Sequence, residues 1–356
     1  MKKLNIEGIA KLAGVSRSTV SRIISGKGYV SPETRKRVMA VIEQMQYKPN
    51  AVARAMASKR TNSIGVIVFR NRQPIVSHPL YGKLIDAILM AAESLGYSVF
   101  LKTDKEMSLR STDFMLENRV EGLILISRLH KNVIDYVKKF NVPYLMVNGS
   151  TDDPEVIHLV SDDVSGGRKA AAHLYGLGHR KIWILAGPQD HRSHKLRLKG
   201  FLGWFDERGG REGLTVVYSP ESDFEHGRKL MAEYWERFQK QGCTAIFATN
   251  DMLAMGALRV LADHAVAVPG QVAVMGFDGT DYAASSTPSL TTVQVDAQRM
   301  GTDAVRLIDA LVNKKGHPQR LNEYECRLIV RQSTGGKPAR PKAAPGRGTD
   351  NTGLTQ

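Results

Sequence analysis

Short apolar segments that alternate with helix-like stretches run through most of this 356-residue chain, and they constrain its fold more than any other feature. Parallel strands need long crossover connections, which are usually helices, so the alternation predicts parallel sheets with helices on both faces. The segments fall into two groups, and we therefore expect an α/β body of two lobes over residues 61–333. The expected strands are 64–68, 97–101, 122–126 and 143–147 in the first group, and 181–186, 214–218, 245–248 and 272–277 in the second.

Polar residues follow several of these expected strands, at the edge where open α/β sheets bind their ligands. Asn148, Asn250 and Asp278 each lie at the end of a strand. Asp162 lies between the two groups, and Arg197 follows the Gly-Pro pair after another strand. A few polar groups that converge between two lobes are typical of a site for a small polar ligand.

The net charge of +15 is concentrated at one end of the chain. Residues 1–60 contain thirteen Lys or Arg and three Glu, which is a net charge of 13 − 3 = +10. Residues 331–356 contain five Lys or Arg and one Asp, or +4, so the residues between carry only 15 − 10 − 4 = +1. A basic end on a nearly neutral body predicts that this end binds a polyanion such as DNA.

The basic segment has the pattern of a helix-turn-helix. An apolar helical stripe at residues 6, 9, 10 and 13 follows Asn5, which is a favourable N-cap. Gly14 suits the left-handed turn that ends such a helix. A second helix, capped by Ser16, has its apolar side chains at 20, 23 and 24, and a third, capped by Ser31 before a proline, has them at 38, 41, 42 and 45.

The outward face of the second helix carries side chains that suit the major groove of DNA. Arg17, Ser18, Ser21 and Arg22 share this face because residues four apart are neighbours on a helix. Arginine can bridge O6 and N7 of guanine, and serine reaches phosphates or base edges without blocking approach. The sequence therefore predicts that this helix reads DNA.

Residues 10–22 (AKLAGVSRSTVSR), 30–35 (VSPETR) and 47–54 (YKPNAVAR) resemble the LacI/GalR family of bacterial transcription regulators. The resemblance implies a helix-turn-helix head at 1–48, a hinge helix and linker at 49–60, and a body like that of periplasmic binding proteins. The chain would cross between the lobes near residues 161, 292 and 322. The resemblance also implies a homodimer that binds a pseudo-palindromic operator, usually as a repressor, under the control of a small sugar-like effector.

By the same resemblance, Arg17, Ser18 and Arg22 occupy base-reading positions. Asn50 can cap a helix at 51–57 that is too short to be stable alone; in the family, paired hinge helices enter the minor groove of the operator. Met56 stands where the family has a leucine wedge that kinks DNA, although an ordinary linker is the alternative. The expected DNA contacts are Ser16, Arg17, Ser18, Thr19, Ser21, Arg22, Tyr29, Ser31, Asn50, Ala53 and Met56.

The resemblance supports the ligand residues at the sheet edges, since family members have an arginine at 197, Asn-Asp at 250–251 and an aspartate at 278. Structural alternatives stay open: an ion pair for Arg197 and Asp278, a helix N-cap for Asn250, and core packing for Phe224. The family's Asn-Pro-Phe-Phe reads His-Pro-Leu-Tyr at 78–81, which leaves the identity of the effector open. The expected effector residues are Leu80, Tyr81, Asn148, Asp162, Arg197, Phe224, Asn250 and Asp278.

Other classes of function find less support. The body has no nucleophile elbow, no phosphate-binding loop and no dinucleotide-binding motif, so we expect neither an enzyme nor a cofactor. The histidines at 191 and 194 are weak evidence for a metal, and none is expected. A solute receptor of a transporter would fit the lobes but not the basic head. A nonspecific architectural protein would not need the large neutral body.

Four further expectations concern the cysteines, the membrane, the cellular location and the tail. Cys243 and Cys326 are expected to be reduced, buried thiols. No run of about 18 apolar residues occurs, so we expect no membrane span. The first residues lack the apolar core of a signal peptide, so we expect a cytoplasmic, nucleoid-associated protein. Residues 334–356 are rich in Gly, Pro, Lys and Arg and are expected to be a disordered basic tail.

Overall fold

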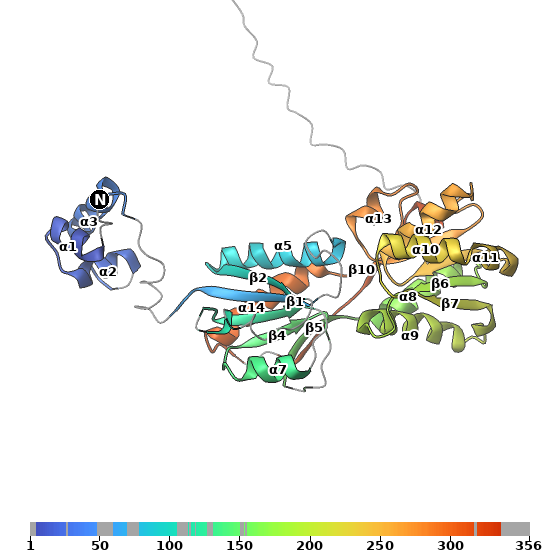
Figure 1. The fold of residues 1–356 in the computed structure, drawn as a ribbon, viewed down its shortest axis with the longest axis horizontal. Helices are drawn as coiled ribbons and strands as arrows, with labels where there is room; N and C mark the ends of the chain where they lie inside the picture. Colours follow the sequence, from blue (N-terminus) through green and yellow to red (C-terminus); the bar gives the residue numbers. More distant parts are fainter. Residues whose placement is uncertain are drawn as a thin grey trace, which may run out of the picture.

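The computed structural model describes residues 5–25, 28–47, 60–69, 78–104, 113, 115–117, 119–126, 131–149, 153, 155–316 and 319–335. The amino-terminal part is a head of three helices, α1 (Ile6–Ala13), α2 (Arg17–Ser25) and α3 (Pro32–Gln44) (Figure 1). Two six-stranded sheets with their helices form the body. The fold class expected from the sequence, a helical head on an α/β body of two lobes, is confirmed.

Local signals set the ends of the head helices. The Asn5 side chain accepts a hydrogen bond from the Gly8 amide at 3.0 Å, and Gly14 ends α1 in the left-handed conformation with φ of 62°. Ser31 caps α3 by accepting from the Thr34 amide at 3.4 Å. The three helices enclose a small core that contains Ile9, Ala10, Ala13, Val20, Ile23 and Val38.

One prediction for the head is wrong. Met45, expected on the inward stripe of the third helix, is 39% exposed. Helix α3 ends at Gln44, and Met45 is the residue that caps it, so the helical period no longer directs its side chain inward. Val41 and Ile42, one turn earlier, do pack against the core.

The first lobe is a parallel sheet with the strand order β11-β5-β4-β3-β1-β2. Buried side chains join α5 (Pro79–Ser94) and α14 (Ala297–Val312) to one face of this sheet, and α7 (Lys131–Lys138) to the other. Its strands are β1 (Ser63–Phe69), β2 (Ser98–Asp104), β3 (Gly122–Ile126), β4 (Tyr144–Val147), β5 (Ile157–Ser161) and β11 (Leu321–Tyr324).

The second lobe has the order β12-β10-β9-β8-β6-β7, parallel except for β12, which is antiparallel to β10. Its strands are β6 (Ile182–Ala186), β7 (Leu214–Tyr218), β8 (Ala245–Ala248), β9 (Ala273–Asp278), β10 (Thr291–Gln294) and β12 (Arg327–Ile329). Helices α8 (Asp163–Gly176) and α9 (Arg192–Asp206) cover one face. Helices α10 (Phe224–Glu233), α11 (Trp235–Gln241) and α12 (Asp251–Asp263) cover the other, and α13 (Asp281–Ser285) follows β9.

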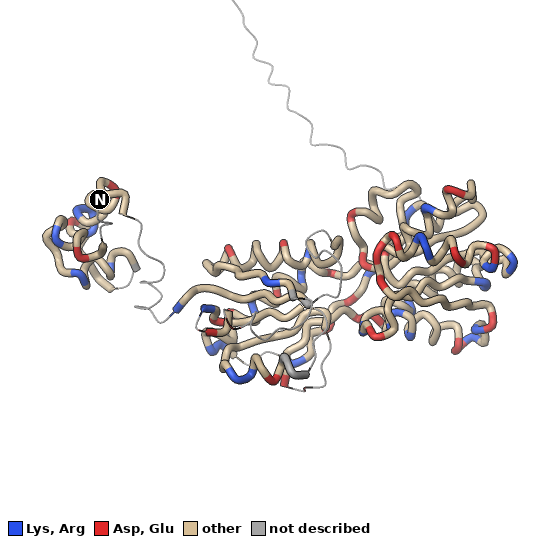
Figure 2. The backbone as a smooth tube through the Cα atoms, viewed as in Figure 1, with Lys and Arg blue, Asp and Glu red and all other residues tan. Residues whose placement is uncertain are grey.

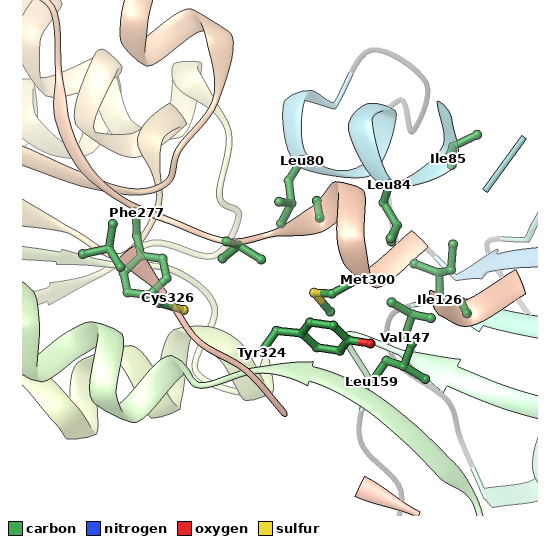
Figure 3. Close-up of a cluster of buried hydrophobic side chains, with 14 of the residues drawn as sticks. Leu80, Leu84, Ile85, Ile126, Val147, Leu159, Phe277, Met300, Tyr324 and Cys326 are labelled. Atoms are coloured by element: carbon green, nitrogen blue, oxygen red, sulfur yellow. The ribbon is translucent and has the colours of Figure 1, made fainter. Parts of the chain in front are cut away.

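The chain passes between the lobes after β5, after β10 and between β11 and β12. The first passage begins at Ser161. The other two lie a few residues beyond 292 and 322, because Thr292 and Asn322 still belong to strands. Figure 3 shows that buried side chains line this region continuously, from Leu80, Met300 and Tyr324 in the first lobe to Phe277 and Cys326 toward the second. The lobes therefore share apolar packing where the chain crosses.

Both cysteines are free and buried, as expected. Burial raises the pKa of the Cys326 thiol to about 12, so it stays protonated. Within the ranges given above, none of the helices combines the length and the apolar character that crossing a membrane requires.

Candidate functional site

The exposed face of α2 carries the side chains expected to read DNA. Arg17, Ser18 and Arg22 are exposed, and Figure 2 shows Lys and Arg along the head with few acidic residues between them. The Ser16 hydroxyl accepts a hydrogen bond from the Thr19 amide at 3.1 Å and lies 2.8 Å from the Ser18 hydroxyl. Ser16 thus holds the start of α2. Arg17 is the first residue of this helix and Arg22 lies in its last turn. Ser21, on the same helix, is partly buried.

The partners of these residues in the head are weak. Arg17 lies 3.5 Å from Glu7, and the two side chains are 70% and 64% exposed. Such exposed ion pairs contribute little to stability, so Arg17 can exchange Glu7 for DNA at small cost. Tyr29 is 87% exposed, whereas Ser31 is engaged as the cap of α3. Asn50, Ala53 and Met56 lie outside the described residues.

In the body, Arg197 is the centre of a buried charged cluster. Its Nε donates to Asp163 Oδ1 at 2.9 Å, and its Nη1 lies 2.8 Å from Asp278 Oδ1. The same Nη1 donates to the Thr249 carbonyl at 2.8 Å, and the guanidinium lies 4.0 Å from the centre of the Phe277 ring. Arg197 is 2% exposed. The predicted pair of Arg197 and Asp278 is therefore together in space, in the ion pair that the sequence left open as a structural alternative.

Two glycines let α8 and α9 approach closely enough to form this cluster. A Cβ on Gly167 would lie 2.1 Å from the Arg197 carbonyl oxygen, and one on Gly200 would lie 2.0 Å from the Val164 carbonyl oxygen. Both distances are shorter than any real contact, so only glycine fits at either position. The close approach brings Asp163, at the start of α8, against Arg197 on α9.

Burial and charge together shift the protonation of this cluster. Burial opposes a charged guanidinium, but the attraction of Asp278 and Asp163 outweighs it and raises the pKa of Arg197. Burial raises the pKa of Asp278 to about 7 despite the attraction of Arg197, and the nearby Asp251 carboxylate adds to the rise. Burial also raises the pKa of Asp251 to about 6, although Thr292 and Thr280 donate hydrogen bonds to it. Asp278 and Asp251 therefore change protonation near neutral pH.

Three buried polar atoms in or beside the cluster lack hydrogen-bond partners among the described residues. One is Asp278 Oδ1, which lies 2.8 Å from Arg197 Nη1, and the other two are Asp163 Oδ2 and Arg192 Nη1. These last two atoms lie 3.5 Å apart, without the geometry of a hydrogen bond. Buried polar groups are almost always satisfied by protein, water or a ligand. The arrangement therefore offers one acceptor and one donor to a small polar molecule.

Side chains from the first lobe reach the same region. The Ser193 hydroxyl on α9 donates to Asn148 Oδ1 at 3.0 Å, which joins the second lobe to the end of β4. His78 caps α5 by accepting from the Tyr81 amide at 3.4 Å. Burial, with the nearby charge of Arg197, lowers the pKa of His78 to about 4, so its ring is neutral at pH 7. The Arg197 cluster thus lies where the lobes meet.

Of the other expected effector residues, two lie in or against the apolar cluster, two cap helices and one begins a helix. Leu80 is buried in the apolar cluster, and Tyr81 packs against it. The Asp162 side chain caps α8 by accepting from the Ser165 amide at 2.9 Å. Asn250 caps α12 by accepting from the Leu253 amide at 3.0 Å, and its amide group donates to the Ser222 carbonyl at 2.7 Å. Phe224 begins α10 and is half-buried.

Sequence reasoning did not select Asp163, Arg192, Ser193 or Thr249. Asp163 follows Asp162 and differs from it only in the direction that its side chain takes from the first turn of α8. Thr249 acts through both its carbonyl and its hydroxyl, which accepts from the Gly187 amide at 2.9 Å and lies 2.7 Å from His194 Nδ1. Its position directly after β8, beside the selected Asn250, was the available signal.

A separate cavity of about 300 Å³ lies between α9 and the ends of β6 and β7. It includes none of the predicted effector residues. Its lining is Ala186, Gly187, Pro188, Gln189, His194, Lys195, Leu198, Lys199, Leu202 and Tyr218. Among the residues with described placement, no three His, Cys, Asp or Glu side chains are grouped so as to hold a metal ion.

Comparison with known proteins gives two matching family models. Residues 5–50 match the bacterial regulatory proteins of the lacI family, and residues 171–334 match a periplasmic binding protein-like domain. Among solved structures, the lac repressor dimer bound to operator and the anti-inducer ONPF has a TM-score of 0.82 and 26% identity, over 94% of this chain and 99% of that one. A complex of the transcriptional regulator CelR with cellobiose has a TM-score of 0.69 and 28% identity, over 93% and 99%.

The similar curated proteins are transcriptional regulators, and the match covers nearly their whole length. The chain is 32% identical to the HTH-type transcriptional regulator CelR of Thermobifida fusca, over 93% of this chain and 98% of that protein. It is 31% identical to the regulator DegA of Bacillus subtilis over the same shares, and 28% identical to the repressor PurR of Photobacterium profundum over 92% and 98%. With its helix-turn-helix head and two-lobed body, the chain belongs to the lacI family of bacterial regulatory proteins and is a DNA-binding transcriptional regulator.

Proposed function

We propose that this regulator is a dimeric repressor that binds a pseudo-palindromic operator through its heads and loses or gains operator affinity when a small polar, sugar-like effector binds between its lobes. The observation that carries the effector site is the pair of buried, unsatisfied atoms, Asp163 Oδ2 and Arg192 Nη1, beside the Arg197 cluster. A sugar hydroxyl both donates and accepts hydrogen bonds, so one hydroxyl can satisfy both atoms.

The position of these atoms supports a ligand that responds to the angle between the lobes. Asp163 and Arg192 belong to α8 and α9 of the second lobe, while Asn148 and His78 belong to the first. A molecule held between them would favour one arrangement of the lobes. It can change operator affinity only by its differential affinity for the two arrangements. The solved complex of CelR with cellobiose is a precedent for a sugar in a relative.

Exposed apolar side chains in the first lobe support a dimer. They lie near the end of α5 and on β2, which is the edge strand of its sheet. Exposed large apolar side chains are candidates for burial in a protein interface. The residues are Leu89, Met90, Leu95, Phe100 and Leu101, of which Met90 is 68% exposed. A second copy of this chain would cover them, and the lac repressor structure named above is a dimer.

One sequence of measurements tests the proposal. The full-length protein selects duplexes from random-sequence DNA, and gel shifts then compare the selected duplex with a scrambled one. We expect a symmetric sequence, two chains per duplex and a clear preference over the scrambled control. A thermal-shift panel of mono- and disaccharides then identifies ligands, because a bound ligand stabilises the folded protein by RT ln(1 + [L]/Kd). Selection of no sequence, or of an asymmetric site bound by one chain, would refute the proposal.

A further inference from the structure

Arg60 is held to the first lobe by several directional contacts. Its Nε and Nη2 donate to Glu121 Oε2 at 3.2 and 2.9 Å. Its Nη1 donates to Asn313 Oδ1 at 3.0 Å. Glu121 also accepts from the backbone amide of Asn62 through Oε1, at 2.8 Å. The first described residues after the hinge are therefore fixed in direction as well as in position.

These contacts lie at one edge of the first sheet. Glu121 directly precedes β3, Tyr97 directly precedes β2, and Arg60 lies three residues before β1. The Tyr97 hydroxyl donates to Asp309 Oδ1 at 3.0 Å, and Arg60 Nη2 donates to the Tyr97 hydroxyl at 3.5 Å. Because the strands are parallel, this amino-terminal edge is opposite to the edge that faces the effector cleft. We name Arg60, Tyr97, Glu121, Asp309 and Asn313 the hinge anchor.

The hinge anchor includes the end of α14. Asn313 caps the carboxyl end of α14, and its amide group donates to Asp309 Oδ1 at 2.7 Å. Helix α14 has 16 residues, so it is about 24 Å long at 1.5 Å per residue. A single helix therefore runs along most of the first lobe (Figure 1), and Asn313 of the hinge anchor caps its carboxyl end.

The other end of α14 lies at the effector cleft. The amide of Val295, two residues before α14, donates to the carbonyl of Asp278 at 3.1 Å. Asp278 is the ion-pair partner of Arg197. The Tyr324 hydroxyl, on the strand before the third lobe crossing, donates to Asp303 Oδ2 at 3.0 Å. The segment just before α14 is thus bonded to Asp278 at the cleft, and the second turn of α14 is bonded to Tyr324 beside the third lobe crossing.

Close packing makes α14 a rigid element. A Cβ on Gly301 would lie 2.7 Å from the Leu84 carbonyl oxygen of α5. Because Gly301 has no side chain, the backbones of the two helices lie in close contact there. A Cβ on Gly122 would lie 2.5 Å from Ile308 Cγ2, so α14 is equally close to the start of β3. A shift of the helix start is therefore transmitted to its end, since tightly packed elements move as units.

We propose that α14 and the hinge anchor couple the effector cleft to the hinge, with Glu121 and Asn313 as the positioning residues that orient Arg60. The inference rests on the proposed function and adds to it the route between the two sites. A continuous chain of contacts is by itself only an indication of coupling, so the test must measure energetic dependence.

The test uses the full-length protein with Glu121→Gln, Asn313→Ala and the double variant, and a duplex selected by the wild-type protein. Neither single change removes a positive charge, so neither can delete a phosphate contact. We expect each to raise the Kd for the duplex by at least about fivefold, the low end of ordinary coupling between sites. The double variant should bind the duplex no more weakly than the weaker-binding single variant, because both changes disrupt the same hinge anchor. The slope of log K against log salt should stay unchanged, as no phosphate contact is lost.

Hydrogen exchange supplies the second readout. In the wild-type protein, the selected duplex should slow amide exchange at residues 297–303, about 9–18 Å along the helix from Asp309, the nearest residue of the hinge anchor. In both single variants, saturating duplex should leave exchange there unchanged while still protecting α2. Arg306→Ala is the matched control, since Arg306 is on α14, its side chain is 70% exposed, and among the described residues its polar contact is with Asp303 alone.

Failure of the route through α14 and failure of the proposed function give different results. Wild-type affinity or wild-type remote protection in both single variants overturns the route through α14, while a wild-type protein that selects no duplex overturns the proposed function itself. If Glu121→Gln lowers the melting temperature of the body, the Asn313→Ala result decides the question alone. An equal loss in Arg306→Ala would reduce the effect to general weakening of α14 and overturn the assigned roles.

Discussion

Arg17 in the head and Arg197 in the body are the same residue type in opposite environments. The Arg17 side chain is 70% exposed and has one long contact, to Glu7. The Arg197 side chain is 3% exposed and contacts Asp163, Asp278 and the Thr249 carbonyl. An exposed arginine is available to a partner that arrives, whereas a buried one is committed to partners that are already present. The same side chain is therefore accessible to a partner in one region and enclosed by its own contacts in the other.

The difference also decides what each residue does to stability. Exposed ion pairs are worth about 0–1 kcal/mol, because water and salt screen them. A buried charge depends on its partners, and removal of one partner leaves the others uncompensated.

The largest effect is expected from Arg197→Met, which leaves the buried carboxyl groups of Asp163 and Asp278 without their shared cation. We expect a loss of about 3–5 kcal/mol in the free energy of unfolding of the body. Denaturant titration followed by tryptophan fluorescence measures it, since Trp183, Trp204 and Trp235 all lie in the second lobe. Arg17→Met is the matched control and should change the same quantity by less than about 0.5 kcal/mol. Similar values for the two variants would remove the contrast.

The next effect concerns DNA. Arg17→Ala and Arg22→Ala should each weaken binding to the selected duplex by about 1–3 kcal/mol and relax base preference at one position of each half-site. Both side chains are exposed on α2, so the melting temperature of the head should stay the same. Lys36→Ala, an exposed cation on α3, controls for loss of charge alone. Equal losses on selected and scrambled DNA would reduce the arginines to phosphate contacts.

The sequence predicts more of the head than of the body. On the head, one helical period and three capping residues predict the helices and the exposed face, because every signal is local. In the body, alternating apolar segments predict the strands, but the partners of Arg197 are 34 and 52 residues away in sequence at Asp163 and Thr249. Their meeting depends on the close contact of α8 and α9 at Gly167 and Gly200, which no local pattern reveals.

Helix N-caps show a second limit of prediction from the sequence. Asp162, Asn148 and Asn250 are all expected to bind the effector, and the sequence raises a helix N-cap as the alternative only for Asn250. In the structure, Asp162 and Asn250 cap helices, and only Asn148 bonds across the lobes. A polar residue between a strand and a helix is at once a candidate ligand and a candidate N-cap. The choice between the two roles depends on the side-chain direction, which tertiary packing decides.

The pH dependence of the body should depend on Asp278. Its folded-state pKa is raised to about 7 by burial, above the value of about 3.9 in an unfolded chain. The folded state therefore binds this proton more tightly, so the contribution of Asp278 to stability is complete below about pH 4 and is lost as pH rises through about 7. Relative to Asp278→Asn, the wild-type body should lose stability over this window, with a slope of at most about 1.4 kcal/mol per pH unit. Denaturant midpoints of both proteins at several pH values measure the difference, and parallel curves would contradict the assignment.

The smallest effect is expected in the head, at the cap of α1. Asn5→Ala removes the acceptor of the Gly8 amide and should cost about 1 kcal/mol, whereas Asn5→Ser keeps an acceptor and should cost only a few tenths. In a domain of this size, 1 kcal/mol corresponds to about 4–8 °C in the melting temperature, so the loss is measurable in spite of its size. Amide exchange in the full-length protein should accelerate at residues 6–13 and, because the head has one small core, also in α2 and α3. Exchange in the second lobe should not change, since the head is stabilised by its own local caps and core. Faster exchange in α8 or α9 after this substitution would mean that the head and the body do not keep separate stabilities, and the contrast between Arg17 and Arg197 would then need another cause.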